Sequence, residues 1–135
     1  LRQRSRPYLF SNSIPPMVAA AGVAMFNLID KTNDLQDKLH SNTDYFVAEM
    51  KKAGFDIKPT QSAICAVMLY DAKLSQDFAA ALQKEGIYVT GFYYPVVPKG
   101  QARIRVQVSA AHEKEHLDRC IAAFTKIGKE LGVIK

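Results

Sequence analysis

Residues 86–112 read GIYVTGFYYPVVPKGQARIRVQVSAAH, and this stretch holds the clearest structural signals in the chain. Its first half is rich in β-branched and aromatic residues, which favours a β-strand. Its middle contains Pro95, Pro98 and Gly100, residues that interrupt regular structure and predict a loop. The stretch is therefore expected to fold as a strand, a loop and a second strand.

The second half of this stretch alternates between apolar and polar residues, as a strand with one buried face does. The apolar face carries Ile104, Val106 and Val108. The other face carries Arg103 and Arg105, and each guanidinium offers a planar fork of N–H donors for a carboxylate or phosphate. An Arg-x-Arg strand is usually just the solvated face of an antiparallel sheet, and periodicity alone favours that interpretation. The binding interpretation needs further evidence from the sequence.

Composition and charge narrow the possible classes of protein. The chain has 135 residues, 48% of them hydrophobic, and a net charge of +5. That length is sufficient for one domain with a hydrophobic core. The sequence shows no basic helix and no basic patch interleaved with aromatics, so we expect no nucleic-acid partner. Cys65 and Cys120 lie far apart without histidines at ligand spacing, which predicts buried free thiols and no metal site.

Membrane association and targeting are not indicated by the sequence. The longest apolar run, residues 17–29, is shorter than the roughly 20 residues that span a bilayer. No signal peptide is visible, and free thiols fit a reducing compartment, so we expect a cytoplasmic location without membrane contact. The chain begins at Leu1 rather than at methionine, which suggests a piece of a longer protein.

The N-terminal part is predicted to be an extended arm, residues 1–16, that leads into a helix. Ser11 and Asn12 are favoured as helix caps, and Pro16 suits the first helical turn. A helix start of this kind can bind an anion, or it can simply be a capped helix. Residues 17–29 are apolar nearly all round, which predicts a helix buried in a core or against a partner.

The remaining segments predict an α+β domain over residues 17–135. We expect further helices at 33–53, 73–84 and 113–131, a short strand at 55–58 and a central strand at 63–70. This order is typical of a small, mostly antiparallel sheet with helices packed on one face. The histidines are expected on helix surfaces or at a cap. The sequence contains no complete catalytic set, so it predicts a binding half-site.

Two stretches resemble a known family. Residues 94–112, YPVVPKGQARIRVQVSAAH, are similar to the C-terminal domain of the α-oxoamine synthases, which are pyridoxal-phosphate enzymes of the aminotransferase type, fold type I. Residues 6–16, RPYLFSNSIPP, resemble the same family at the matching place upstream, and the resemblance covers the whole chain. The segment YPVVPKG and the ending IGKELGVI are most similar to the members that act on glycine and acetyl-CoA.

The resemblance implies the small C-terminal domain of a homodimeric acyltransferase. Such an enzyme condenses glycine with acetyl-CoA to 2-amino-3-ketobutyrate and CoA, a reaction of threonine degradation, with pyridoxal 5'-phosphate as electron sink. In the family, the second arginine of the Arg-x-Arg strand binds the substrate carboxylate, and that position is Arg105 here. Ser11 and Asn12 resemble the place where the partner subunit reaches the cofactor phosphate.

Other residues of the family's active site have no counterpart in this chain. The Schiff-base lysine, the aspartate paired with the cofactor ring nitrogen and the stacked histidine lie upstream in the family. We therefore expect this chain alone to be inactive and to hold the cofactor weakly. Two alternatives are another α-oxoamine synthase with a different amino acid or acyl-CoA, and a freestanding regulatory domain that binds a small carboxylate.

Overall fold

The computed structural model describes residues 3–9 and 14–135, and the chain divides into two compact units. The first unit runs to Asp34, and the second is Leu35–Lys135. The boundary predicted between an arm at residues 1–16 and a domain at 17–135 concerns the whole protein, and it stays a prediction.

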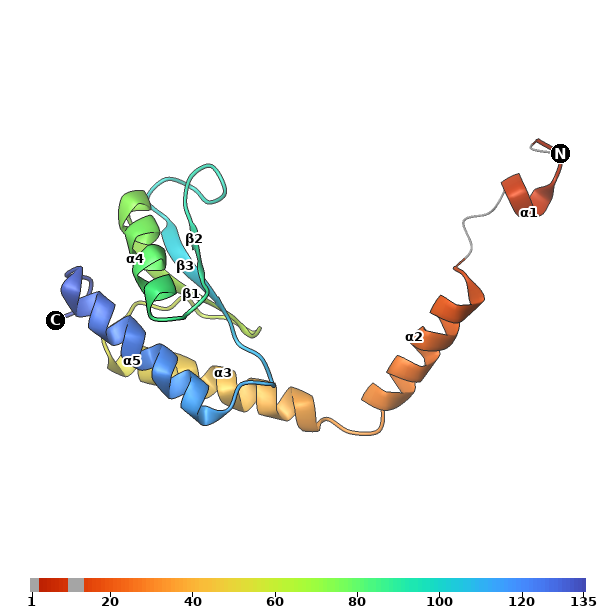
Figure 1. Ribbon diagram of the computed structural model, residues 1–135, viewed down its shortest axis with the longest axis horizontal. Coiled ribbons are helices and arrows are strands. Elements are labelled where there is room, and N and C mark those ends of the chain that lie inside the picture. The colour runs from red at the N-terminus through yellow and green to blue at the C-terminus, as the bar shows by residue number, and fades with distance from the viewer. Residues whose placement is uncertain (1–2, 10–13) are drawn as a thin grey trace. The chain divides into compact units, whose positions relative to one another are not determined.

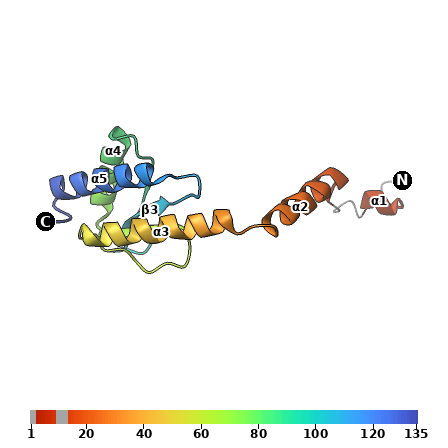
Figure 2. The same cartoon turned by 90° about the horizontal axis from the view of Figure 1, so that it is seen from below.

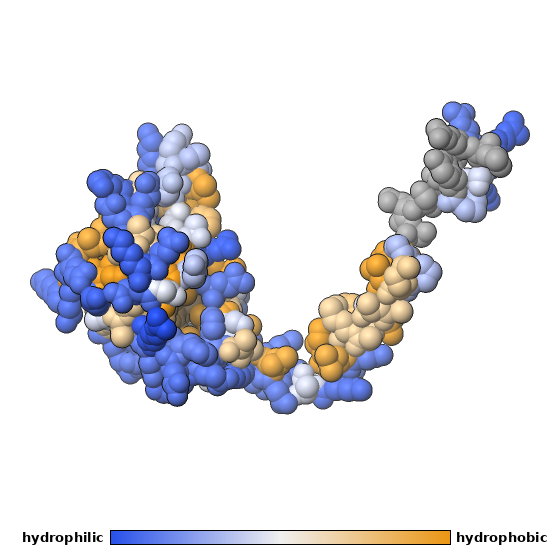
Figure 3. Space-filling model, in the orientation of Figure 1, coloured by the Kyte–Doolittle hydropathy of each residue, from blue (hydrophilic) through white to orange (hydrophobic). Residues whose placement is uncertain are grey.

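The first unit contains the helices α1 (Arg6–Leu9) and α2 (Pro16–Ile29). As predicted, α2 begins at the proline pair, and the Val18 N–H donates a 2.9 Å hydrogen bond to the Pro15 carbonyl. No side chain of α2 is buried by the described residues, and Figure 3 shows an apolar surface along the helix. The burial predicted for this helix is therefore not provided by the described part of the chain.

The second unit holds the sheet and the remaining helices, as Figure 1 shows. The elements follow in the order α3 (Asp34–Lys52), β1 (Ile64–Tyr70), α4 (Ala72–Lys84), β2 (Thr90–Phe92), β3 (Ala102–Gln107) and α5 (Lys114–Glu130). The helix predictions are confirmed to within two residues at either end. Asp71 caps α4 with its carboxylate, which accepts a 2.7 Å hydrogen bond from the Leu74 N–H.

The sheet is antiparallel and has the strand order β1-β3-β2. The strand that carries the two arginines, β3, therefore lies in the centre. This finding corrects the prediction that residues 63–70 form a central strand, because the only strand that pairs with β1 in the described part of the chain is β3, and the other edge of β1 makes just an isolated bridge. The continuous apolar run of β1 has another cause: Val67 faces the helices, while Met68 on the opposite face is also buried.

A second correction concerns residues 55–58, which do not form a strand. Ile57 makes only an isolated bridge to Val67. Two hydrogen bonds flank this bridge, from the Lys58 N–H to the Ala66 carbonyl and from the Met68 N–H to the Asp56 carbonyl. Pro59 follows directly and has no N–H to extend the ladder, so pairing ends there.

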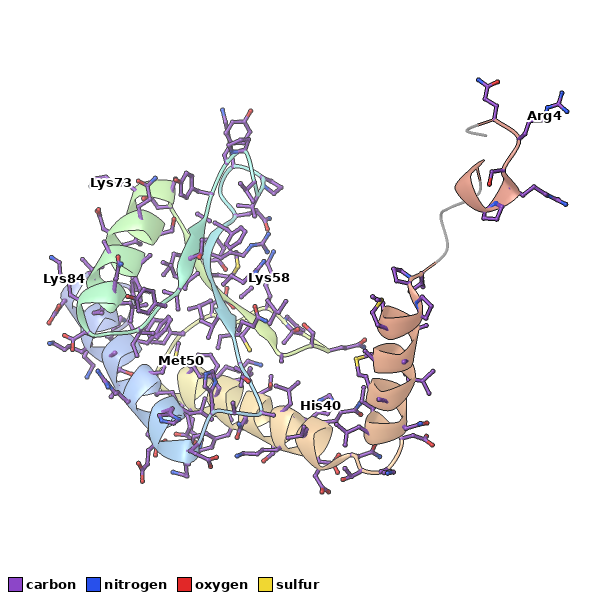
Figure 4. All side chains as sticks on the ribbon, turned by 45° about the vertical axis from the view of Figure 1, so that its right-hand side comes forward. Arg4, His40, Met50, Lys58, Lys73 and Lys84 are labelled. Atoms are coloured by element: carbon purple, nitrogen blue, oxygen red, sulfur yellow. The ribbon has the colours of Figure 1, made fainter. Side chains whose placement is uncertain are left out.

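The hydrophobic core lies between the sheet and the helices α3, α4 and α5. Its centre is a cluster of four phenylalanine rings with centroid separations of 5.5–6.3 Å, contributed by Phe46, Phe55, Phe78 and Phe124. Figures 1 and 2 show α3 and α5 running alongside each other below the sheet. Figure 4 shows Met50 of α3 directed into the unit and Lys73 and Lys84 of α4 directed outward. Within the unit Leu35–Lys135, the helices lie on one face of the sheet, in agreement with the α+β prediction.

Candidate functional site

The open face of the sheet is built from rows of residues that face each other across the strands. One row contains Ala66, Arg105 and Thr90, and the next contains Met68, Arg103 and Phe92. The two arginines are the only charged side chains in these rows of described residues. This face of the sheet is therefore positively charged and suited to an anionic ligand.

Arg105 is exposed at the centre of this face. Its guanidinium carbon lies 5.1 Å from the centroid of the Phe92 ring, which is a cation–π contact. Within residues 3–9 and 14–135, no hydrogen bond or ion pair joins Arg105 to another side chain. The contact with the ring uses no hydrogen bond of the guanidinium, so Arg105 can offer its fork of N–H donors to a carboxylate.

Arg103 lies on the same face, two residues earlier on β3, and is half-buried. Its cross-strand neighbours are Met68 and Phe92. The structure thus confirms the shared face that the alternation predicted. It also shows a difference that the alternation did not contain, because Arg105 is the exposed member of the pair and the one in contact with the Phe92 ring.

The loop between β2 and β3 borders this face. Lys58 donates a 2.6 Å hydrogen bond to the Gln101 side chain and so connects the segment before β1 to the end of this loop. The Lys99 ammonium lies 5.2 Å from the centroid of the Tyr94 ring. The loop therefore carries one cation, Lys99, and two exposed tyrosine rings next to the arginine rows.

Two histidines contact the backbone at the start of α5. His112 was expected at a cap or on the surface, whereas His116 was expected on the helix surface and instead takes part in a capping box. The Ser109 N–H donates to His112 Nδ1 at 3.2 Å, and the Glu113 N–H donates to His116 Nδ1 at 3.0 Å. A cavity of about 430 Å³ lies beside these two rings, between α5 and β3, on the face away from Arg105. It does not contact the arginine rows and is separate from the candidate site.

Both cysteines are free thiols, and the predicted burial is complete only for Cys65. Cys65 is fully buried and Cys120 is half-buried, and burial raises the pKa of each thiol to about 11. No group of three or more His, Cys, Asp or Glu side chains could hold a metal ion among the described residues. Over the same residues, no helix is both long and apolar enough to cross a membrane.

The other predicted site residues, Ser11 and Asn12, lie outside the described residues. The predicted contact with a cofactor phosphate stays a prediction. Sequence reasoning missed Phe92, because its contact with Arg105 depends on the pairing register of β2 with β3. A strand prediction gives the face on which a residue lies but not its neighbour across the sheet.

The antiparallel sheet with helices on one face matches the C-terminal domain of fold type I pyridoxal-phosphate enzymes. Solved serine palmitoyltransferases share this fold. The enzyme from S. paucimobilis aligns with a TM-score of 0.81 and 30% identity, over 98% of this chain and 34% of its own. The Sphingomonas wittichii enzyme aligns with a TM-score of 0.82 and 28% identity, over 99% of this chain and 34% of its own.

The family model for aminotransferase class I and II matches residues 1–124, and this chain belongs to that family. It is 56% identical to 2-amino-3-ketobutyrate coenzyme A ligase of Escherichia coli K12, over 99% of this chain and 34% of that protein. The human mitochondrial protein of the same name is 47% identical, over 99% and 32%. The predicted fold class and family resemblance are confirmed. The chain spans about a third of the length of the curated relatives it matches.

The described residues fit a substrate carboxylate better than the cofactor itself. A lysine that holds the cofactor covalently would lie within an enclosed site, and none of the described lysines is buried. The arginine rows supply anion-binding donors but no carboxylate that could pair with a ring nitrogen. The described part of the chain therefore offers an anion-binding face without a residue that would hold the cofactor covalently.

Proposed function

We propose that this chain is the part of a pyridoxal-phosphate acyltransferase that binds the carboxylate of the amino-acid substrate. The whole protein condenses glycine with acetyl-CoA to 2-amino-3-ketobutyrate and CoA, a step of threonine degradation. The relatives of that name, 56% and 47% identical over nearly the whole chain, support this assignment. Pyridoxal phosphate, when bound, supplies an electron sink for the reacting carbon.

The observation that carries the proposal is the exposed Arg105 at the centre of the open sheet face. Its donors are not used by any other described side chain, and its ring contact restricts the plane of the guanidinium. A bidentate pair with a carboxylate fixes both the position and the orientation of a small amino acid. Arg105 thus binds and orients the substrate, while the groups that carry out the bond changes come from outside this chain.

The quaternary arrangement and the location belong to the same proposal. The whole protein is a homodimer in which Ser11 and Asn12 reach the cofactor phosphate of the partner subunit. The exposed apolar surface of α2 is consistent with contacts beyond the described residues. A cytoplasmic location belongs to the same proposal, although the mammalian relatives are named mitochondrial.

A second candidate function is another acyl transfer within the same family. An 8-amino-7-oxononanoate synthase of Petrotoga mobilis is 44% identical over 99% of this chain. A panel of amino acids and acyl-CoA thioesters tested on the whole protein separates the two candidates. Preference for glycine with acetyl-CoA supports the first candidate, and preference for another pair supports the second.

The test of the proposed role is Arg105→Ala in the whole protein, with Arg103→Ala as the matched control. Loss of a charge-assisted bidentate contact should weaken glycine binding by about 2–5 kcal/mol. The affinity for acetyl-CoA should stay unchanged. Arg103→Ala should have the smaller effect on glycine. Equal glycine affinity in Arg105→Ala and the unaltered protein would exclude the assigned role.

A further inference from the structure

Phe92 occupies a defined place beside the candidate carboxylate-binding arginine. It lies directly across the sheet from Arg103 and diagonally across from Arg105, on the same open face. Diagonal neighbours on a sheet are within reach of aromatic and long side chains. The distance of 5.1 Å from the Arg105 guanidinium carbon to the ring centroid shows that this contact is made.

The backbone that carries Phe92 is held from below by α4. Gly91 lies so close to this helix that a Cβ atom there would meet the Ser75 carbonyl oxygen at 2.8 Å. Ser75 is fully buried, and its hydroxyl donates a 2.8 Å hydrogen bond to the Ala72 carbonyl. Residue 91 therefore rests against a fixed surface of α4, and the aromatic ring of the next residue stands on a well-supported strand.

The contact between the Phe92 ring and the Arg105 guanidinium has a direct consequence for ligand binding. Arginine has a long, flexible side chain, and its guanidinium can face many directions when nothing contacts it. A ring in contact with the guanidinium reduces the number of orientations that the side chain samples. Part of the ordering cost of binding is then met before the ligand arrives, and the N–H donors stay available to it.

We propose that Phe92 is a positioning residue that orients Arg105 for the substrate carboxylate. This inference rests on the proposed function, because it assumes that Arg105 binds glycine. It assigns to Phe92 a contribution that acts through the arginine and requires no contact with the substrate. The contribution depends on the electron-rich face of the ring and therefore differs from a simple filling of space.

The experiment replaces the ring in the whole protein and measures glycine binding by calorimetry together with kcat and KM. Phe92→Leu removes the aromatic face and should weaken glycine binding about 3- to 30-fold, with little change in kcat or in the KM for acetyl-CoA. Phe92→Tyr keeps the face and should bind glycine within about twofold of the unaltered protein.

A second variant separates electrostatics from shape. Pentafluorophenylalanine at position 92 retains the shape of the ring but reverses the sign of its face. It should therefore weaken glycine binding as Phe92→Leu does, without any loss of packing. In an Arg105→Ala background neither change should have a further effect, because residues that act through one contact are not additive.

The outcomes distinguish this inference from the function on which it rests. Normal glycine binding in Arg105→Ala would overturn the proposed function itself. Weak binding in Arg105→Ala, together with normal binding in the leucine and pentafluorophenylalanine variants, would overturn only the positioning role. Equal losses for Phe92→Tyr and Phe92→Leu would also overturn that role, because the tyrosine ring keeps the face.

Discussion

Replacing Gly91 by alanine adds one methyl group at the closest contact between β2 and α4. The new carbon would lie 2.8 Å from the carbonyl oxygen of Ser75 and 3.2 Å from its carbonyl carbon. Ordinary van der Waals contact begins at 3.4 Å, so β2 must move away from α4 by about 0.6 Å. Gly91 has no positive φ, so the cost of this change is steric.

The expected magnitude follows from two opposing effects. Overpacking against a buried backbone costs about 1–3 kcal/mol, since the helix cannot yield as a flexible side chain would. The loss of glycine's freedom in the unfolded chain offsets about 0.4–1 kcal/mol of this. We expect a net destabilisation of about 1–2 kcal/mol, which lowers Tm by roughly 5–10 °C for a unit of this size.

Thermal unfolding of the chain, followed by circular dichroism, measures this effect. The matched control is Gly22→Ala, the same chemical change on α2, where nothing lies within 4 Å of the added carbon. That control should leave the unfolding of Leu35–Lys135 unchanged. An unaltered or raised Tm for Gly91→Ala would show that β2 does not rest on α4 as closely as described.

Three further predictions concern the second unit. Phe124→Ala should lower the free energy of unfolding in urea by about 3–5 kcal/mol, because Phe124 is fully buried against three other rings. The control Tyr88→Ala removes an exposed ring and should change this free energy by no more than about 0.5 kcal/mol. Similar values for the two variants would contradict this core. The Asn42 amide donates hydrogen bonds to the backbone carbonyls of Ser109 and His112, at 3.1 and 2.8 Å. Asn42→Asp places a carboxylate, which cannot donate, against these carbonyls, so it should lower the urea midpoint more than Asn42→Ala does. The reverse order would refute these contacts. Burial raises the pKa of Cys65 and Cys120 from about 9 to about 11, because it disfavours the thiolate. The contribution of the two neutral thiols to the stability of the folded state is therefore complete below pH 9 and is lost as the pH rises through 11. Over that window the urea midpoint should fall more steeply than in the double Cys→Ala variant, and parallel curves would exclude a contribution from these thiols.

Local patterns were sufficient to predict most elements of the fold. The alternation around Ile104 and Val106 located β3 and its two faces, and the helix boundaries followed from capping residues, prolines and apolar periodicity. The pattern did not reveal which strand is central. A continuous apolar run such as the one around Met68 is expected both for a central strand and for an edge strand whose two faces are buried. Strand order is a property of long-range pairing, and a single segment does not contain it.

For the candidate site, too, the sequence predicted the face of the strand on which the residues lie but not their neighbours across the sheet. The shared face of Arg103 and Arg105 follows from a period of two, but the choice of Arg105 came from the family resemblance. The contact with Phe92 required the register between β2 and β3, which depends on how the intervening loop closes. Sequence reasoning could therefore identify a binding face, although it could not identify the partner that orients the arginine.

The central position of β3 also limits how this domain can change in evolution. One face of β3 belongs to the core and the other to the arginine rows, so inserting or deleting one residue within it would exchange the two faces. The loop at residues 93–101 is under no such constraint, since it joins the strands at the margin of the sheet. Relatives with new substrates are therefore expected to differ in the length and side chains of this loop, while the register of β3 stays fixed.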